Sequence, residues 1–259
     1  MRSARVLLRL LVLVPWSAAC FALWLVVALP AALVGRLASS RARVQHLWSR
    51  GMCALLGVRL QVCGTPPRGG TLLVSNHLSY LDILVLAALF PCTFVSKAEV
   101  ARWPVIGFLA RAMGTVFLER ERKRTLAGVN EVLAARLARG QALVIFPEGT
   151  STSGADVLAF RPALLEPAVA LGLPVHFAAL QYATAPGERP ASEVVCWWGD
   201  MTFGSHLLGL LALPGVEASI VFGAEPLRAT DRKELALRLR RAVVESLRPP
   251  SSPCLIAVP

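Results

Sequence analysis

Three ionisable side chains lie beside apolar runs in this sequence. His77 and Asp82 belong to the stretch LLVSNHLSYLDILVL at residues 72–86, and Glu148 follows the apolar run at 142–146. An imidazole or a carboxylate at the edge of a core costs free energy unless it is paired or used chemically. These three residues are therefore the first candidates for chemistry.

The spacing of His77 and Asp82 restricts how they can meet. Residues five apart on one regular helix point about 140° away from each other. The two side chains can pair only if His77 lies in a loop after a strand and Asp82 lies in the first turns of the next helix, which Ser79 would cap. A carboxylate on one imidazole nitrogen fixes the tautomer and leaves the other nitrogen as a base. We therefore predict that His77 is a general base.

The nucleophile is the next question. Ser151 lies in GTSTS at 149–153, but Ser153 stands where the G-x-S-x-G elbow has its second glycine, and the serine follows the histidine instead of preceding it. A serine-type lipid hydrolase remains one alternative, and a non-catalytic membrane-binding protein is another. If the base has no side chain to activate, it activates a substrate hydroxyl, and the reaction is acyl transfer to an alcohol.

Composition indicates a globular protein associated with a membrane. The chain has 259 residues, 55% of them hydrophobic, and a net charge of +11, with a mean hydropathy of +0.59. This is too apolar for an ordinary soluble enzyme, and the charge favours an anionic membrane surface over nucleic acid. The six cysteines form no CxxC pair and no cluster with histidine, so we expect free thiols in a reducing compartment and no metal site.

The N-terminal segment is expected to anchor the chain. Residues Leu10 to Val34 carry no charge and have arginines on both sides. This uncharged segment is long enough to span a bilayer with some tilt. Pro15 and Pro30 leave a kinked or re-entrant insertion open, and the basic flanks leave the orientation open. We divide the chain into an anchor with its basic flank (1–49), a catalytic domain (50–248) and a loop-like tail (249–259).

Short strand patterns alternate with helical ones after the anchor, which predicts an α/β domain with a sheet covered by helices. Helical spacing occurs at 126–137, ending at Gly140, and again at 235–247, where Thr230 is a candidate cap. Two apolar stretches, 83–94 and 206–216, are too short to span and are expected to be buried helices or interfacial segments. The expected strands are 58–62, 72–75, 93–95, 115–118, 142–146, 175–182, 194–198 and 218–222.

Four motifs in order resemble the glycerolipid acyltransferases, the superfamily that contains lysophosphatidic acid acyltransferase. NHLSYLD at 76–82 matches N-H-x4-D and FPEGT at 146–150 matches F-P-E-G-T, while GTVFLER at 114–120 and GLPVHFAAL at 172–180 resemble the two other motifs. The resemblance covers about residues 50–225. It implies a mixed sheet flanked by helices, membrane lipid biosynthesis as the role, and an acyl carrier protein or coenzyme A thioester as the donor, with no cofactor and no metal.

The resemblance also implies roles for individual residues. His77 would deprotonate the acceptor hydroxyl of a lysolipid, with Asp82 orienting it. Substrate contacts are implied for the acceptor pocket and its flanks, at Glu148, Gly149, Thr150, Arg120, Arg161 and Asn76. Glu148 and Arg120 have surface roles as alternatives, and Asn76 has the alternative of shaping the turn.

The sequence departs from the family at residue 151. Lysophosphatidic acid acyltransferases typically continue F-P-E-G-T with Arg, whereas this chain has Ser151. Arg makes two charge-assisted hydrogen bonds to a phosphate, and a serine offers one neutral donor. A branch that acylates lyso-ornithine lipid, an acceptor without phosphate, is similar here and in the run at 197–216. We therefore expect either lyso-ornithine lipid or 1-acyl-glycerol-3-phosphate as the acceptor, at the cytoplasmic face of the inner membrane.

Overall fold

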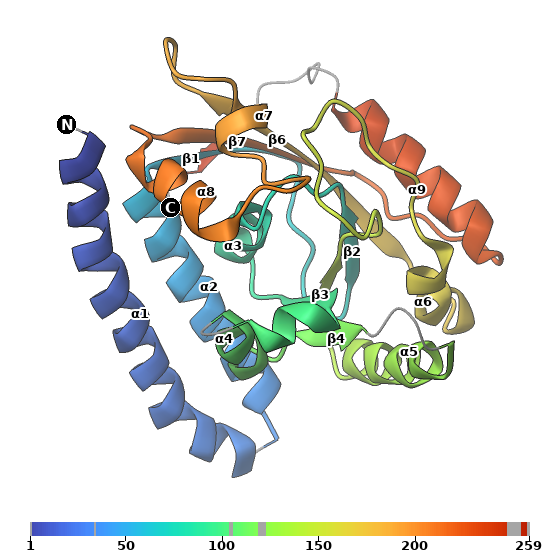
Figure 1. Cartoon of the computed structure of the whole chain (residues 1–259). Helices are drawn as coiled ribbons and strands as arrows, with labels where there is room; N and C mark the ends of the chain where they lie inside the picture. Colours follow the sequence, from blue (N-terminus) through green and yellow to red (C-terminus); the bar gives the residue numbers. More distant parts are fainter. Residues whose placement is uncertain (1, 34, 104–105, 119–122, 248–254, 258–259) are drawn as a thin grey trace.

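The computed structural model describes residues 2–33, 35–103, 106–118, 123–247 and 255–257, which form one sheet covered by helices on both faces (Figure 1). The strand order is β4-β3-β5-β2-β6-β7-β1-β8. The pairs β6–β7 and β1–β8 are antiparallel and the others are parallel, so the expected mixed α/β sheet is confirmed. The strands are β1 (Val58–Cys63), β2 (Leu72–Ser75), β3 (Thr93–Lys97), β4 (Val116–Leu118), β5 (Leu143–Ile145), β6 (Val175–Thr184), β7 (Val216–Phe222) and β8 (Leu255–Ala257).

The helices divide between the two faces of the sheet because successive strand side chains point to opposite sides. Leu73 packs in a core with α2, α3 and α8, whereas Leu72 and Val74 pack in a second core with α5, α6 and α9. The helices are α1 (Arg2–Leu33), α2 (Leu37–Leu56), α3 (Leu81–Leu89), α4 (Ile106–Ala112), α5 (Lys123–Ala138), α6 (Glu166–Ala170), α7 (Ala191–Val194), α8 (Phe203–Ala212) and α9 (Arg232–Ser246), with 3-10 turns at Ala98–Arg102 and Pro162–Leu165.

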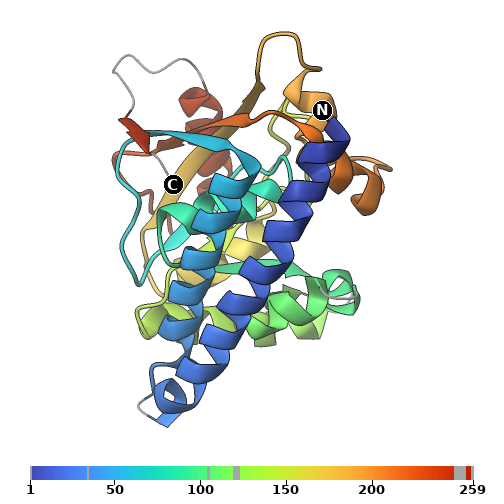
Figure 2. The ribbon, with the colours of Figure 1, turned by 90° about the vertical axis from the view of Figure 1, so that its left-hand side faces the viewer.

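The N-terminal segment forms a helical hairpin. The chain turns back after α1 through Gly35, whose φ of +68° suits glycine, and α2 returns along α1 to the sheet (Figure 2). Arg9 is only 7% exposed. It donates to the carbonyls of Leu211 and Leu213 at the C-terminal end of α8 and to that of Leu56 at the end of α2. It therefore satisfies helix-terminal carbonyls that would otherwise lack donors, and it holds the start of α1 against the catalytic domain.

Several predicted elements differ from the structure. Residues 194–198 were expected to be a strand, but they contain the end of α7 and a loop. The cap of α9 is the Asp231 carboxylate, which accepts from two N–H groups, instead of Thr230. The tail is not all loop, since β8 pairs with β1. The expected boundary between residues 49 and 50 lies inside α2.

The expected helices at the two short apolar stretches are present. In α3, seven of the nine residues are buried, so it is a core helix. One side of α8 is buried through Leu210 and Leu211, while Leu208 on the other side is exposed. The thiols of Cys20, Cys53, Cys92 and Cys196 are free and buried. Cys63 is disulfide-bonded, so the prediction that every cysteine is free was wrong for this residue.

Candidate active site

The candidate base and its carboxylate are paired at the end of β2. His77 lies in the loop after the strand and Asp82 lies in the first turn of α3, the placement that their spacing required. The distance between His77 Nδ1 and Asp82 Oδ2 is 2.7 Å. Because a carboxylate accepts, Nδ1 carries the hydrogen and Nε2 keeps its lone pair. The geometry leaves Nε2 as a base.

Asp82 is held in place from several sides. It is fully buried, and Oδ2 also accepts from the backbone N–H groups of Leu78 (2.7 Å) and Ser79 (3.1 Å). We expected the hydroxyl of Ser79 to cap α3, but that helix start has no side-chain cap on the Ser79 hydroxyl. The Asp82 carboxylate accepts instead from two amides of the loop before α3, so it fixes that loop and does not cap the helix.

The His77 ring is oriented by stacking as well. Its centroid lies 4.1 Å from that of Phe146, with 13° between the ring planes. Phe146 is itself buried at the end of β5. The side chain of His77 is 21% exposed. A substrate can therefore reach the imidazole, while its ring plane and one nitrogen are fixed.

Glu148 connects the two motifs. It is 3% exposed, and its Oε1 accepts from the backbone N–H of His77 while its Oε2 accepts from that of Leu158, both at 2.7 Å. Burial raises the pKa of Glu148, although the two amide hydrogen bonds act in the opposite direction. With both oxygens engaged, Glu148 positions the backbone of His77, and its expected contact with the acceptor stays a prediction.

The other predicted binding residues are placed differently from one another. Gly149 closes a turn with φ of +73°, and Thr150 is exposed beside it. The exposed Arg161 donates from Nε to the Glu148 carbonyl at 3.4 Å. Arg120 lies outside the described residues. These residues, Arg120 apart, belong to one loop system next to His77.

Asn76 has a structural position. It is 2% exposed, its Nδ2 donates to the Leu180 carbonyl at 2.9 Å, and its Oδ1 accepts from the Leu180 N–H at 2.8 Å. This side chain continues the pairing of β2 with β6 beyond Ser75, which is the end of the strand. These two hydrogen bonds favour the alternative in which Asn76 shapes the turn. The role of Asn76 in substrate binding stays a prediction.

Ser151 contacts a loop, residues 196–201, that the sequence did not place at the site. Its hydroxyl donates to the carbonyl of Trp197, and the Trp197 N–H donates to the Leu78 carbonyl at 2.8 Å. Thr152 N–H in turn donates to the His77 carbonyl at 2.9 Å. One residue of the 196–201 loop, Trp197, thus links the loop of His77 with the loop of Ser151.

Comparisons with known proteins agree with this geometry. The profile of the family described as "Acyltransferase" matches residues 59–180. A lyso-ornithine lipid O-acyltransferase of Rhodobacter capsulatus is 39% identical over 197 residues, which is 73% of this chain and 70% of that protein. The chain belongs to the acyltransferase family. The resemblance read from the four motifs is therefore confirmed, and this protein is an enzyme of acyl transfer.

Two further comparisons refine the picture of this acyltransferase. A 1-acyl-sn-glycerol-3-phosphate acyltransferase of Neisseria gonorrhoeae is 35% identical over 206 residues, 79% of this chain and 80% of that protein. The crystal structure of the 1-acyl-sn-glycerophosphate acyltransferase PlsC from Thermotoga maritima superposes with a TM-score of 0.67 at 22% identity, over 97% of this chain and 100% of that one. The structural match shows the fold of the acyltransferase.

Tyr182 is a site residue that the sequence reading missed. Its hydroxyl donates to Asp82 Oδ1 at 2.7 Å from β6. Burial and the adjacent Asp82 carboxylate raise the pKa of Tyr182, so the hydroxyl keeps its proton and remains a donor. The sequence held one indication of this role. Tyr182 lies in the strand that begins within GLPVHFAAL, at a position where alternation along the strand predicts a side chain that points into the core.

We expect Tyr182→Phe to lower kcat of the acyltransferase about ten-fold and to leave both KM values unchanged. Asp82 would lose one of its hydrogen bonds, worth about 1.5–3 kcal/mol for a charged acceptor, and would orient His77 less well. Steady-state kinetics with an acyl thioester measures the change. Tyr80→Phe, in the chain's other tyrosine, is the matched control. Equal losses in kcat for both variants would mean that Tyr182 acts only through stability.

Proposed function

We propose that this acyltransferase moves an acyl group from a thioester of acyl carrier protein or coenzyme A to the hydroxyl of a lysolipid, with lyso-ornithine lipid as the preferred acceptor. His77 Nε2 removes the proton of the hydroxyl, and the oxygen attacks the thioester carbonyl. The tetrahedral intermediate collapses to the ester, and the thiolate leaves with the proton returned by the imidazolium. The His77–Asp82 pair, with Nε2 kept as a base, is the observation that carries this proposal.

The position of Ser151 argues against a serine hydrolase. In such an enzyme the serine hydroxyl donates to the histidine that activates it. Here the Ser151 hydroxyl donates to the Trp197 carbonyl. A Ser151→Ala variant is therefore expected to retain acyl transfer, and a complete loss of turnover would reinstate the hydrolase alternative.

The same residue supports an acceptor without phosphate. Lysophosphatidic acid acyltransferases typically have Arg at this position. This chain has Ser151, a short neutral side chain whose hydroxyl already donates a hydrogen bond to the Trp197 carbonyl. A phosphate would lose a bidentate donor at this place. The lyso-ornithine lipid O-acyltransferase and the 1-acyl-sn-glycerol-3-phosphate acyltransferase named above act on different acceptors and are 39% and 35% identical to this chain. Residue 151, more than overall similarity, therefore guides the choice of acceptor.

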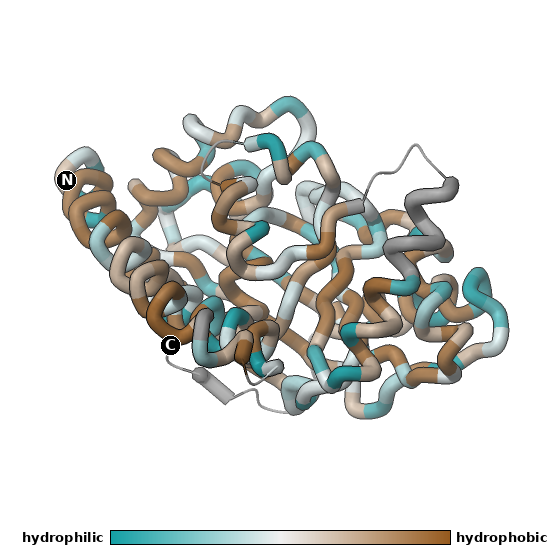
Figure 3. Tube along the Cα trace, turned by 90° about the horizontal axis from the view of Figure 1, so that it is seen from below, coloured by the Kyte–Doolittle hydropathy of each residue, from teal (hydrophilic) through white to brown (hydrophobic). Residues whose placement is uncertain are grey.

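We further propose that α1 holds the enzyme at the cytoplasmic face of the inner membrane. Among the described residues, α1 is long and apolar enough to cross a bilayer, and its trace is largely hydrophobic in Figure 3. Because Arg9 fixes the start of α1 to the domain and α2 returns to it, a hairpin that enters and leaves on one side explains both contacts. The large exposed apolar side chains of α1 are Leu7, Leu8, Leu11, Val12, Val14, Leu23, Leu25, Val26 and Leu33.

A competition assay tests the acceptor. Purified enzyme in detergent receives one labelled acyl thioester and equal amounts of lyso-ornithine lipid and 1-acyl-glycerol-3-phosphate, and the two products are separated. We expect most of the label in ornithine lipid. Label found mainly in phosphatidic acid would overturn the acceptor assignment and leave the acyl-transfer chemistry intact. Repeating the assay with acyl carrier protein and coenzyme A thioesters identifies the donor.

We expect Ser151→Arg to shift the preference toward 1-acyl-glycerol-3-phosphate. A guanidinium beside the acceptor loop would add one or two charged hydrogen bonds to phosphate, about 1.5–3 kcal/mol each before the lost Trp197 contact is subtracted. The ratio of kcat/KM for the two acceptors would then change by about ten-fold. Ser153→Arg, two residues along the same loop, is the matched control. An identical change in both variants would show a general effect of added charge.

A further inference from the structure

Two arginines converge on one point away from the active site. Arg41 comes from α2 and Arg136 from α5, and the Nη1 atoms of both lie within 4 Å of the position where a Cβ on Gly114 would be. Arg136 Nη1 also donates to the Gly114 carbonyl at 2.6 Å. Gly114 itself has φ of +80°, which glycine adopts without strain. The two guanidinium groups therefore face the same small space.

These positive charges have no acidic partner within the part of the chain that the structure describes. Neither Arg41 nor Arg136 is in a salt bridge there. Burial and the neighbouring charge of Arg41 lower the pKa of Arg136, as expected when like charges are held together. Two partly buried cations side by side cost free energy that a bound anion would offset.

The polar side-chain atoms of the two arginines and of Trp24 are all donors. Arg41 lies over the ring of Trp24 in α1, with its Cζ 5.9 Å from the centroid. The Nε of Arg41 and the Nε1 of Trp24 are both buried and have no hydrogen-bond partner among the described residues. Guanidinium and indole N–H groups can only donate. The ligand that suits this set has several acceptor oxygens and a negative charge, as a phosphate does.

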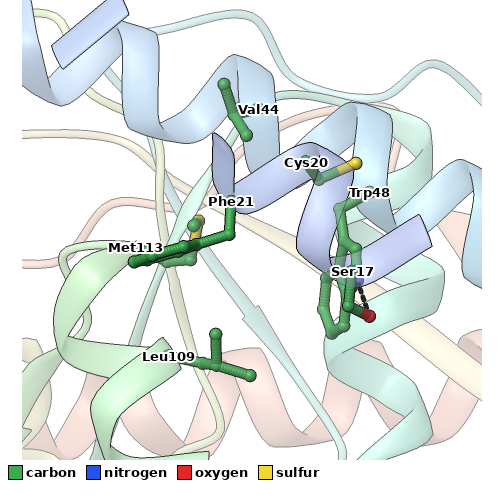
Figure 4. A pocket seen from close by; sticks show the side chains of 7 residues that line it. All are labelled: Ser17, Cys20, Phe21, Val44, Trp48, Leu109 and Met113. Atoms are coloured by element: carbon green, nitrogen blue, oxygen red, sulfur yellow. Dashed lines mark hydrogen bonds between the residues drawn. The ribbon is translucent and has the colours of Figure 1, made fainter. Parts of the chain in front are cut away.

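A mostly apolar pocket lies between α1, α2 and α4 (Figure 4). It has a volume of about 30 Å³, enough for a small apolar group. Phe21 at its edge contacts the Trp24 ring at 5.3 Å and the exposed Phe108 ring at 5.5 Å between centroids. The lining residues are Ser17, Cys20, Phe21, Val44, Trp48, Leu109 and Met113.

We propose that Arg41, Arg136 and Trp24 bind the phosphate of an anionic membrane phospholipid whose acyl chain lies along the apolar surface of α1 and α4. The exposed side chains of Val26 on α1 and Phe108 on α4 offer an apolar surface to the acyl chain of the phospholipid. Free phosphate has no acyl chain and would gain nothing from this surface. None of the three binding residues hydrogen-bonds to His77, Asp82 or Glu148 in the described structure. Gly114 and Arg136 come before β4 and β5, whereas His77 follows β2, and these strands are parallel, so the proposed lipid site and the active site lie at opposite ends of the strands.

Vesicle binding tests the proposal on the full-length enzyme. Flotation with phosphatidylglycerol and with phosphatidylcholine vesicles compares the wild type, the double variant Arg41→Gln/Arg136→Gln, and the matched control Arg43→Gln/Arg139→Gln, which removes two exposed arginines close to the first pair in sequence. Because a basic residue near a lipid surface contributes about 1 kcal/mol, we expect a roughly five- to ten-fold larger loss of phosphatidylglycerol affinity for the inner pair. Binding to phosphatidylcholine should not change. Equal losses for the two pairs would mean diffuse attraction and would overturn the site.

A second measurement does not depend on the folding of the Arg41→Gln/Arg136→Gln variant. The melting temperature is followed with dihexanoyl phosphatidylglycerol, dihexanoyl phosphatidylcholine or inorganic phosphate at equal concentration and ionic strength. We expect only the phosphatidylglycerol to raise it, in the wild type and in the Arg43→Gln/Arg139→Gln control. An equal rise with inorganic phosphate would replace the lipid with a free anion, and no rise with either would overturn the proposal.

Discussion

His77→Ala is expected to reduce acyl transfer by about 10²–10⁴-fold, the range that a positioned general base contributes. The variant removes the nitrogen that takes the acceptor proton, and no other imidazole hydrogen-bonds to Asp82 among the described residues. Release of free thiol from an acyl thioester in the presence of lysolipid measures the rate. The melting temperature should change little, because the side chain is partly exposed.

His176→Ala is the control for this prediction. His176 lies on β6, where it pairs with Leu73 of β2, and burial lowers its pKa, so an imidazole is lost without touching the Asp82 pair. The control should keep nearly full activity. If His77→Ala also keeps nearly full activity, His77 is not the base, and another group takes the proton of the acceptor hydroxyl.

The pairing of His77 with Asp82 was predictable because it is local. Five residues separate the two, and a strand end followed by a helix start leaves few ways for them to meet. The hydrogen bond from Tyr182 to Asp82 spans 100 residues, and it depends on β6 lying next to β2 in the sheet. Sequence periodicity gives the direction of a side chain within a strand but not the order of the strands.

The 196–201 loop shows a second limit. Residues 194–198, which overlap this loop, were predicted to be a strand, since short apolar runs are ambiguous by pattern alone. In the structure Trp197 uses its backbone N–H and carbonyl on Leu78 and Ser151, so tertiary contacts replace the ladder of a sheet. Arg9 is similar: its charge at the flank of an apolar helix predicted a membrane border, yet the side chain binds three backbone carbonyls of the domain.

Glu148→Ala is expected to lower the free energy of unfolding by roughly 3–5 kcal/mol, together with most of the activity. The carboxylate accepts two hydrogen bonds, from the backbone N–H groups of His77 and Leu158, and a charged hydrogen bond is worth about 1.5–3 kcal/mol. Alanine would leave both N–H groups without their acceptor beside a buried cavity. The loop that carries His77 would also lose its hydrogen bond to the FPEGT motif. Denaturant unfolding in detergent measures the stability.

The comparison with Glu166→Ala distinguishes this role from a general effect of losing a carboxylate. Glu166 forms an exposed ion pair with Arg232 at 2.9 Å, and such pairs contribute about 0–1 kcal/mol. Glu148→Gln keeps one acceptor oxygen and should fall between wild type and alanine in both stability and kcat. If Glu148→Ala unfolds like the wild type but has a raised KM for the lysolipid alone, Glu148 binds the acceptor directly, and its hydrogen bonds to the two loops are secondary.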